Sequence, residues 1–376
     1  MKLAAFKRLV ARTSLLLWAA AGYAFRLRAR PVKPETILIV SRFLLGDTLM
    51  LAPLFAALRH HYPGARLFLA VQSKFLPLFS LQPYGVTALA FDLEDPQSVR
   101  QLRRRGPFDL AVVPGENRNA IAARAFRSRW IVAIDGDRPA WKNFICDELI
   151  PLSARMGTIY DAFVELAGPD LGLRHRQGDW TVPATPSGIP DLQHRPYVIL
   201  HVGSSSAGRR WPAELWRKLA DILSENGHRI FWSAGPGEEA IAREIDPAGR
   251  YTDTSGRLDL LQLWTFVKEA ALLISADTGI VHMAKLNGCA TVCLYGPGGE
   301  MLVGKGHFFR DARIQGVVVP HFRDRRDGRV FKRQMPWAKG WRGPVADEPR
   351  PDPEQQLQAV VDAAYALLHA YRQPTT

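Results

Sequence analysis

The sequence predicts an α/β protein built from two doubly wound, Rossmann-like domains, preceded by a basic N-terminal segment. Short apolar runs alternate with amphipathic ones in both halves, and loops rich in Gly, Ser or Asp follow several apolar runs. This alternation is typical of a parallel sheet covered on both faces. The 376 residues suffice for two such domains, and a hydrophobic content of 47% supports buried cores.

The N-terminal domain is expected over residues 35–170. Its predicted strands are Ile37–Val40, Ala65–Val71, Thr87–Phe91, Leu110–Val113 and Trp130–Ala133. Its predicted helices are Thr48–His61, Ser73–Leu81, Ser98–Arg105 and Asn119–Phe126. Pro53 lies within the first of these helices, so either the helix kinks there or its regular part begins there.

A segment rich in Gly, Pro and polar residues, 171–195, is predicted to link the domains. The alternation resumes at Tyr197 and ends at Pro297, within a C-terminal domain expected over 196–350. A last helix is predicted within 351–376, where Asp352 can cap it and Pro353 can start it.

The segment 1–34 contains eight Lys or Arg and no acidic residue, and an uncharged, mostly apolar stretch covers 14–25. That stretch is about half the ~20 residues that a membrane-spanning helix needs. We expect an interfacial membrane anchor; a signal-like or spanning segment and a solvated extension are the alternatives. The apolar face of the anchor would hold Leu3, Phe6, Leu9 and Val10.

The net charge of +13 resides in two segments, because 321–342 adds eight basic residues against two acidic ones. The rest of the chain is close to neutral, which argues against a nucleic-acid binder and fits an enzyme that meets an anionic surface or acceptor. The cysteines, Cys146, Cys289 and Cys293, have no paired spacing. They indicate a reducing compartment without a disulfide framework, and the last two are expected in the core.

The most informative motif is Ser275–His282, which follows the apolar run 270–274 and opens a helix that Gly288 would end. Asp277 is expected to cap the helix, whose first N–H groups form an anion site. His282 lies one turn after Thr278, so its ring can face the same pocket. The motif is a candidate seat for a diphosphate; the alternative is a capped turn with a packing histidine.

Three other loops follow predicted strands. Gly46-Asp47 comes after Ile37–Val40, at the start of an amphipathic run. The segment 201–212 separates the strand Tyr197–Leu200 from a helix that Pro212 can start. The third loop, 234–238, follows the strand Ile230–Ser233. In doubly wound sheets, ligands bind at the carboxyl ends of the strands, where all four segments are predicted to lie.

In this order and spacing, the four segments resemble glycosyltransferase family 9, the heptosyltransferases of lipopolysaccharide core assembly, from about Thr36 to Pro297. The resemblance implies a GT-B fold, in which two domains face each other across a cleft and the last helix packs back toward the N-terminal domain. The donor nucleotide would bind the C-terminal domain and the acceptor the N-terminal one. The implied reaction is inverting transfer of a heptose from ADP-heptose, or of another nucleotide-activated sugar, to a lipopolysaccharide-core or related glycolipid.

By this resemblance, Asp47 occupies the family's Gly-Asp position and is the candidate catalytic base; the alternative is a helix cap only. Arg209 matches the family's basic residue, and a guanidinium can clamp a diphosphate with two donors. Arg210 is the alternative clamp, and either arginine could instead be a solvated loop charge.

The other donor-binding candidates surround the same motif. Thr278 and Gly279 would offer backbone N–H groups, and the side chains of Ser205 and Ser206 further donors. Asp277 would cap the helix or bind a sugar hydroxyl or a basic side chain. His282 would donate to the phosphate or the sugar, with a core histidine as the alternative.

We expect no Asp-x-Asp metal site in the loops of either domain. Arg209 and the helix N-terminus can supply the charge that a metal would, so we predict metal-independent transfer and no cofactor. One departure from the family follows Gly296-Pro297, where many members carry a Cys-rich patch and this chain has the basic, aromatic segment 321–342. That segment could hold acceptor phosphates, lie on the membrane or be a solvated loop.

These inferences favour a cytoplasmic enzyme, peripheral on the inner face of the cytoplasmic membrane, whose partners are a nucleotide sugar and a glycolipid. A nucleotide-sugar epimerase on the same fold is a competing hypothesis, and it would turn over donor without acceptor. A non-catalytic, membrane-bound glycan-binding module is another, against which the set of site residues argues.

Overall fold

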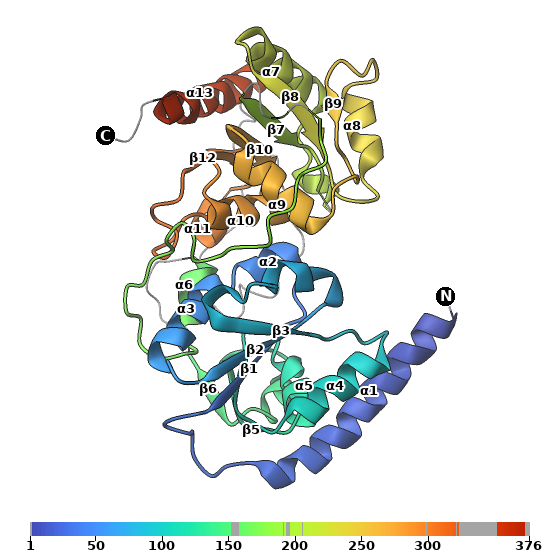
Figure 1. The fold of residues 1–376 in the computed structure, drawn as a ribbon, viewed down its shortest axis with the longest axis vertical. Coiled ribbons are helices and arrows are strands. Elements are labelled where there is room, and N and C mark those ends of the chain that lie inside the picture. Colours follow the sequence, from blue (N-terminus) through green and yellow to red (C-terminus); the bar gives the residue numbers. More distant parts are fainter. Residues whose placement is uncertain are drawn as a thin grey trace. The chain divides into compact units, whose positions relative to one another are not determined.

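The computed structural model describes residues 2–151, 158–190, 192, 196–204, 206–297, 299–320, 322 and 352–372. These residues form two compact units, divided between Arg174 and His175. Each unit is an α/β domain with one six-stranded sheet (Figure 1). The predicted fold class, two doubly wound Rossmann-like domains, is confirmed at the level of each unit.

The sheet of unit 1 has the strand order β3-β2-β1-β4-β5-β6, and all its pairings are parallel. Its central strand is buried over its whole length, as expected for an apolar strand covered on both faces. The strands are β1 (Thr36–Val40), β2 (Arg66–Val71), β3 (Val86–Ala90), β4 (Phe108–Val113), β5 (Ser128–Ile134) and β6 (Glu148–Ile150). The five predicted strands are therefore confirmed within two residues, and β6 was not predicted.

The sheet of unit 2 repeats this topology, with the order β12-β11-β10-β7-β8-β9 and parallel pairings throughout. In both sheets the first strand of the unit lies beside the fourth, which is where the strand order reverses and ligands bind in such folds. The strands are β7 (Tyr197–His201), β8 (Arg229–Ser233), β9 (Thr252–Asp253), β10 (Leu272–Ala276), β11 (Thr291–Tyr295) and β12 (Ile314–Val318).

The helices cover both sheets (Figure 1). In unit 1 they are α1 (Lys2–Gly22), α2 (Leu45–Leu49), α3 (Ala52–His61), α4 (Pro96–Arg105), α5 (Ala120–Ala125) and α6 (Ile159–Val164). In unit 2 they are α7 (Ala213–Glu225), α8 (Glu239–Ile245), α9 (Leu260–Glu269), α10 (Gly279–Asn287), α11 (Gly299–Val303) and α13 (Pro353–Arg372). The predicted helix Ser73–Leu81 is a 3₁₀ segment, Ser73–Phe79, with Pro77 inside it.

The predicted helix Thr48–His61 consists of two helices, α2 and α3, which meet at Met50 and Leu51. Pro53 lies in the first turn of α3, where its missing N–H group costs no intrahelical hydrogen bond. Of the two alternatives, the regular helix therefore begins at the proline rather than kinking there. The separate short helix α2 carries Gly46 and Asp47.

The N-terminal helix α1 packs on unit 1 beside α4 and α5 (Figure 1). Its docked side carries Ala11, Leu15 and Ala19, which belong to the core of unit 1, followed by the buried Gly22. A Cβ atom at Gly22 would clash with the main-chain oxygen of Arg124 in α5, so only glycine permits this approach. The segment predicted as separate, 1–34, is thus joined to unit 1 through α1.

No described helix is both long and apolar enough to cross a membrane. The side chains of Leu3 and Phe6, which we expected on the anchoring face, lie outside the described side chains. Those of Leu9 and Val10 are exposed.

The segment predicted as a linker, 171–195, divides between the two units. His175 already belongs to unit 2, because its N–H group donates to Phe308 O at 2.9 Å and its Nε2 atom lies 3.0 Å from Leu286 O. Trp180 is buried. The described residues from 176 to 190 contain no helix or strand, as the composition of the segment indicated.

The last helix, α13, begins at Pro353 as predicted, but its apolar face packs within unit 2. Leu357, Val360, Ala364 and Leu368 belong to the core that includes β10, β11, β12 and α7. The second sheet therefore buries the apolar face of this helix, and its packing toward the N-terminal domain stays a prediction. Most of the basic segment 321–342 lies outside the described residues, and so does Ser205.

Candidate functional site

Most of the predicted donor-side residues follow two adjacent strands of unit 2. β7 and β10 pair in parallel, with Ser275 opposite His201, so their carboxyl ends lie side by side. The loop after β7 contains Ser206 and Arg209, and the one after β10 contains Asp277 and Thr278. The structure therefore brings these sequence-predicted residues to the point where the strand order reverses.

Arg209 connects the two loops directly. Its Nη1 atom donates to the main-chain oxygen of Asp277 at 2.5 Å and lies 3.5 Å from the Oδ2 atom of the same residue. The arginine ends a 3₁₀ turn, Ala207–Arg209, in which its own N–H group donates to Ser206 O at 3.0 Å. The neighbouring Arg210 is exposed. Of the two arginines considered as the clamp, Arg209 is the one that contacts the Asp-Thr-Gly motif.

The carboxylate of Asp277 also faces His282, whose Nε2 atom lies 3.4 Å from Asp277 Oδ1. Burial acts to raise the pKa of Asp277, but the hydrogen bond and charge of His282, with the charge of Arg209, outweigh it and lower that pKa. Burial, followed by the charge of Lys285, lowers the pKa of His282. The carboxylate of Asp277 thus lies between the guanidinium of Arg209 and the imidazole of His282.

The helix cap differs from the prediction by one residue. Thr278, not Asp277, is the N-cap of α10, with extended backbone dihedrals and no hydrogen bond from its side chain to the first turn. Its Oγ1 atom lies 3.2 Å from Ser275 Oγ. Asp277 does not cap because its carboxylate faces Arg209 and His282. The expected alternative for Asp277, pairing with a basic side chain, is confirmed.

Lys285 is a residue of this site that the sequence did not point to. It is buried on α10, and its Nζ atom donates to Val303 O at 2.5 Å and to Gly304 O at 2.8 Å, at the end of α11. Its charge also lowers the pKa values of His282 and Asp277. The sequence feature that could have indicated a buried role for Lys285 is its position within an otherwise mostly apolar helical run.

The loops after β7 and β8 approach each other beside this group. A Cβ atom at Gly203 would meet the carboxylate of Glu238 and the backbone of Ala234, so glycine suits this crossing. The Glu238 carboxylate accepts from the N–H group of Gly235 at 3.2 Å. His201, at the end of β7, is buried, and its Nδ1 atom lies 3.0 Å from Ser233 Oγ. Burial lowers the pKa of His201 to about 4.

Asp47 lies on unit 1, in the first turn of α2, whose N-cap is Leu44. It is therefore part of the helix rather than its cap. The preceding loop is fixed by Gln72, whose Nε2 atom donates to Phe43 O at 2.7 Å, and by stacking of Phe43 on Phe163. This loop follows the central strand β1, so it also lies at the carboxyl end of the sheet where the strand order reverses.

Among the described residues there is no cluster of three or more His, Cys, Asp or Glu side chains with the geometry to hold a metal ion. The three cysteines are free, and Cys289 and Cys293 are buried as predicted.

Comparison with known proteins agrees with the motifs. Residues 164–304 match the model of glycosyltransferase family 9 (heptosyltransferase). Lipopolysaccharide heptosyltransferase 1 of Salmonella typhimurium is 28% identical over 34% of this chain, and the match spans only 41% of that relative. Lipooligosaccharide heptosyltransferase 2 of Haemophilus ducreyi is 25% identical over 69% of this chain and 83% of its own length.

A solved structure shares the fold. The Escherichia coli ADP-heptose lipopolysaccharide heptosyltransferase II superposes with a TM-score of 0.66 and 17% identity, covering 90% of this chain and 100% of that one. The two parallel sheets and this neighbour identify the fold as GT-B. The match to the family model and the two relatives show that the chain is similar to glycosyltransferase family 9 and its lipopolysaccharide heptosyltransferases.

Proposed function

We propose that the protein is an inverting glycosyltransferase that transfers a heptose from ADP-heptose to a lipopolysaccharide-core or related glycolipid. The observation that carries the proposal is the contact of Arg209 with Asp277 and of Asp277 with His282, at the carboxyl ends of adjacent strands. These are three of the positions at which the sequence resembles family 9. The donor is proposed from the E. coli structural neighbour, which is described as an ADP-heptose enzyme.

On the donor side, unit 2 would stabilise the leaving diphosphate. The contacts of Nη1 with Asp277 orient the guanidinium, whose planar fork suits two phosphate oxygens. The start of α10 adds backbone N–H groups and the positive end of a nine-residue helix. The interactions of the guanidinium and of the helix start with the diphosphate become stronger as negative charge develops on it. They therefore stabilise the transition state more than the bound substrate, which lowers the barrier to transfer.

On the acceptor side, Asp47 would take the proton of the attacking hydroxyl. The acceptor oxygen forms a bond to the anomeric carbon while the bond from that carbon to the diphosphate oxygen breaks. ADP leaves with the electron pair, and the configuration at the carbon inverts. A single displacement of this kind needs one base, and a positioned general base contributes about 10²–10⁴-fold in rate. No step in this mechanism is assigned to a metal ion.

The proposed acceptor is a membrane lipid, so the proposal includes a peripheral location on the inner face of the cytoplasmic membrane. The basic, acid-free segment 1–34 supports this location, since anionic lipids attract such segments.

Calorimetric titration of the full chain with ADP-heptose, UDP-sugars and GDP-sugars tests the donor assignment. The full chain is needed because α1 contributes to the core of unit 1. We expect preference for ADP-heptose, a loss of affinity of about tenfold or more in Arg209→Ala, and little change in the exposed control Arg210→Ala. Preference for a UDP- or GDP-sugar would overturn the heptose assignment, and equal effects of the two variants would overturn the role of Arg209.

A further inference from the structure

Helix α1 has apolar residues on two opposite sides. One side docks on unit 1 through Ala11, Leu15 and Ala19. The other side, here called the outward face, consists of Leu9, Val10, Leu16 and Leu17, which are 62, 37, 58 and 68% exposed. A helix that covers a soluble domain normally turns polar residues to water. The outward face therefore requires an apolar or interfacial environment that the described part of unit 1 does not supply.

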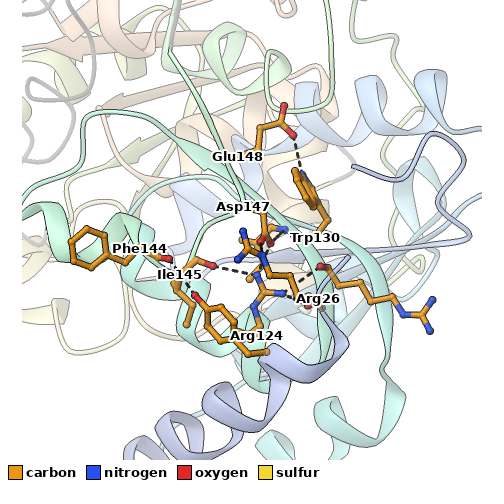
Figure 2. A network of polar contacts seen from close by, with 11 residues as sticks. Arg26, Arg124, Trp130, Phe144, Ile145, Asp147 and Glu148 are labelled. Atoms are coloured by element: carbon orange, nitrogen blue, oxygen red, sulfur yellow. Dashed lines mark hydrogen bonds and ion pairs between the residues drawn. The ribbon is translucent and has the colours of Figure 1, made fainter. Parts of the chain in front are cut away.

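The segment that follows the C-terminal end of α1 is attached to unit 1 by a network of polar contacts (Figure 2). Arg26 forms an ion pair with Asp147, which also accepts from Arg124 Nη2 at 2.5 Å and from Ile131 N at 2.8 Å. Arg124 and Asp147 are buried, and removing one partner of such a pair is strongly destabilising. The backbone continues this attachment, since Leu27 N donates to Arg129 O at 3.0 Å.

These contacts fix the direction of α1 across the sheet of unit 1. Its C-terminal end is tied to residues at the amino ends of β5 and β6, namely Arg129 and Asp147. Near its N-terminal end, Arg8 forms an ion pair with Glu94, in the loop after β3. The helix therefore runs from the carboxyl-end edge of the sheet to the opposite edge, and its N-terminal part lies at the edge that carries Asp47.

Four arginines gather at this edge, two on α1 and two in the loops after β1 and β4. Burial, followed by the positive charges of Arg118 and of Arg12 and Arg8 on α1, lowers the pKa of Arg42. These arginines are therefore close enough to interact electrostatically, and Arg42 lies only five positions before Asp47. Glu94, Asp92 and Glu116, which forms an ion pair with Arg118, offset part of the charge. Basic side chains flanking an exposed apolar helix face are the pattern of helices that lie in the interface of anionic membranes.

We propose that the outward face of α1 lies in the interfacial region of an anionic phospholipid bilayer, with Arg12 and Arg42 against the lipid phosphates. This inference rests on the proposed function and deepens it. It names the surface of unit 1 that binds the membrane and the direction in which that surface faces. Since α1 is fixed to unit 1, binding would bring the Asp47 edge to the membrane, where a glycolipid acceptor is presented.

Vesicle co-sedimentation of the full chain tests the proposal, with vesicles of equal parts phosphatidylglycerol and phosphatidylcholine and with phosphatidylcholine alone. We expect binding to the anionic vesicles and a loss of about tenfold or more in partitioning for L16E/L17E. The matched control is L81E/L171E, which places the same charges at exposed leucines outside α1 and should change partitioning by less than about twofold. Circular dichroism and melting curves check that both variants are folded.

A second pair of measurements separates this proposal from the proposed function. R12S/R42S should weaken binding to anionic vesicles several-fold but leave binding to phosphatidylcholine unchanged. Transfer to a deacylated, water-soluble acceptor should be the same in L16E/L17E and in the unaltered protein, whereas transfer to acceptor in vesicles should fall. Failure of the unaltered protein to transfer to either acceptor would reject the proposed function, while the vesicle result would still decide the role of α1.

Two results would overturn the inference. One is anionic-vesicle binding by L16E/L17E equal to that of the unaltered protein. The other is absence of vesicle binding together with a dimer in solution that L16E/L17E converts to monomer, since the outward face would then be an interface between two copies of the chain.

Discussion

The carboxylate of Asp277 lies 3.4 Å from Nε2 of His282, on the helix that follows the same strand. The same carboxylate lies 3.5 Å from Nη1 of Arg209, which comes from the loop after the neighbouring strand. Asp277 therefore holds together two side chains proposed to meet the donor. Its role is to position them, since a carboxylate is a poor direct partner for a diphosphate.

Asp277→Asn should weaken binding of ADP-heptose by about tenfold, because a neutral amide orients the guanidinium less strongly than a carboxylate does. Calorimetry measures the effect. Asp259→Asn is the control, since Asp259 caps α9 in the same unit and asparagine caps equally well. Unchanged affinity in Asp277→Asn would show that Arg209 is positioned by other contacts.

Asp47→Asn should lower the turnover rate by about 10²-fold or more while leaving donor affinity unchanged, because it removes the proposed base while the proposed donor residues belong to unit 2. Steady-state kinetics with a saturating donor measure the rate. The control Asp95→Asn changes an N-cap in the same unit to another good capping residue. An equal fall in the turnover rate of both variants would contradict the assignment of Asp47 as the catalytic base.

Acid should destabilise unit 2 through His201. Burial lowers the pKa of His201 from 6.5 to about 4, so between these values the unfolded chain binds the proton more readily than the folded one. The contribution of His201 to the free energy of unfolding is fully present above pH 6.5. It is lost as the pH falls toward 4, and the loss amounts to up to about 3 kcal/mol. Urea unfolding at several pH values should show a shallower acid dependence in His201→Gln, and an identical dependence would contradict the assignment.

Lys285→Met should lower the free energy of unfolding by about 1–3 kcal/mol, because the carbonyl groups of Val303 and Gly304 lose their donor in a buried place. Thermal and urea unfolding measure the loss. Lys268→Met, on the exposed last turn of α9, is the matched control and should change stability by less than about 0.5 kcal/mol. Equal stability of the two variants would show that α11 does not depend on Lys285.

Treatment with EDTA should leave transfer unchanged, because the charge on the leaving diphosphate is assigned to Arg209 and the start of α10. The test is the rate before and after chelation and after return of Mg²⁺ or Mn²⁺. Loss of the rate with EDTA and recovery with either cation would refute metal independence.

The fold could be predicted because the central strands are continuous apolar runs, such as β1, which is buried throughout. The short strands β6 and β9 were missed, since two or three residues carry no usable periodicity. The prediction that the alternation ends at Pro297 was wrong, because β12 follows at Ile314–Val318. For α1, the sequence showed an apolar, basic helix but gave no means of deciding which face docks. Its docking depends on Gly22 and Arg124, which are more than a hundred positions apart.

The donor-side residues could be predicted from their motifs, because the topology of a doubly wound sheet places loops after adjacent strands together. Two details could not be predicted: that Arg209 rather than Arg210 contacts the motif, and that the helix cap is Thr278 rather than Asp277. Both depend on side-chain contacts between the loops. Lys285 was unexpected because a lysine on a helix is normally solvated. Here the end of α11 supplies two carbonyl acceptors.

The most direct test of the central claim is mass spectrometry of a heptose-deficient lipopolysaccharide-core glycolipid after incubation with ADP-heptose and the full chain. We predict that the acceptor gains one heptosyl group, that ADP appears in equal amount, and that Asp47→Asn forms little product. Conversion of ADP-heptose without acceptor, or an acceptor left unmodified while the donor binds, would contradict the account.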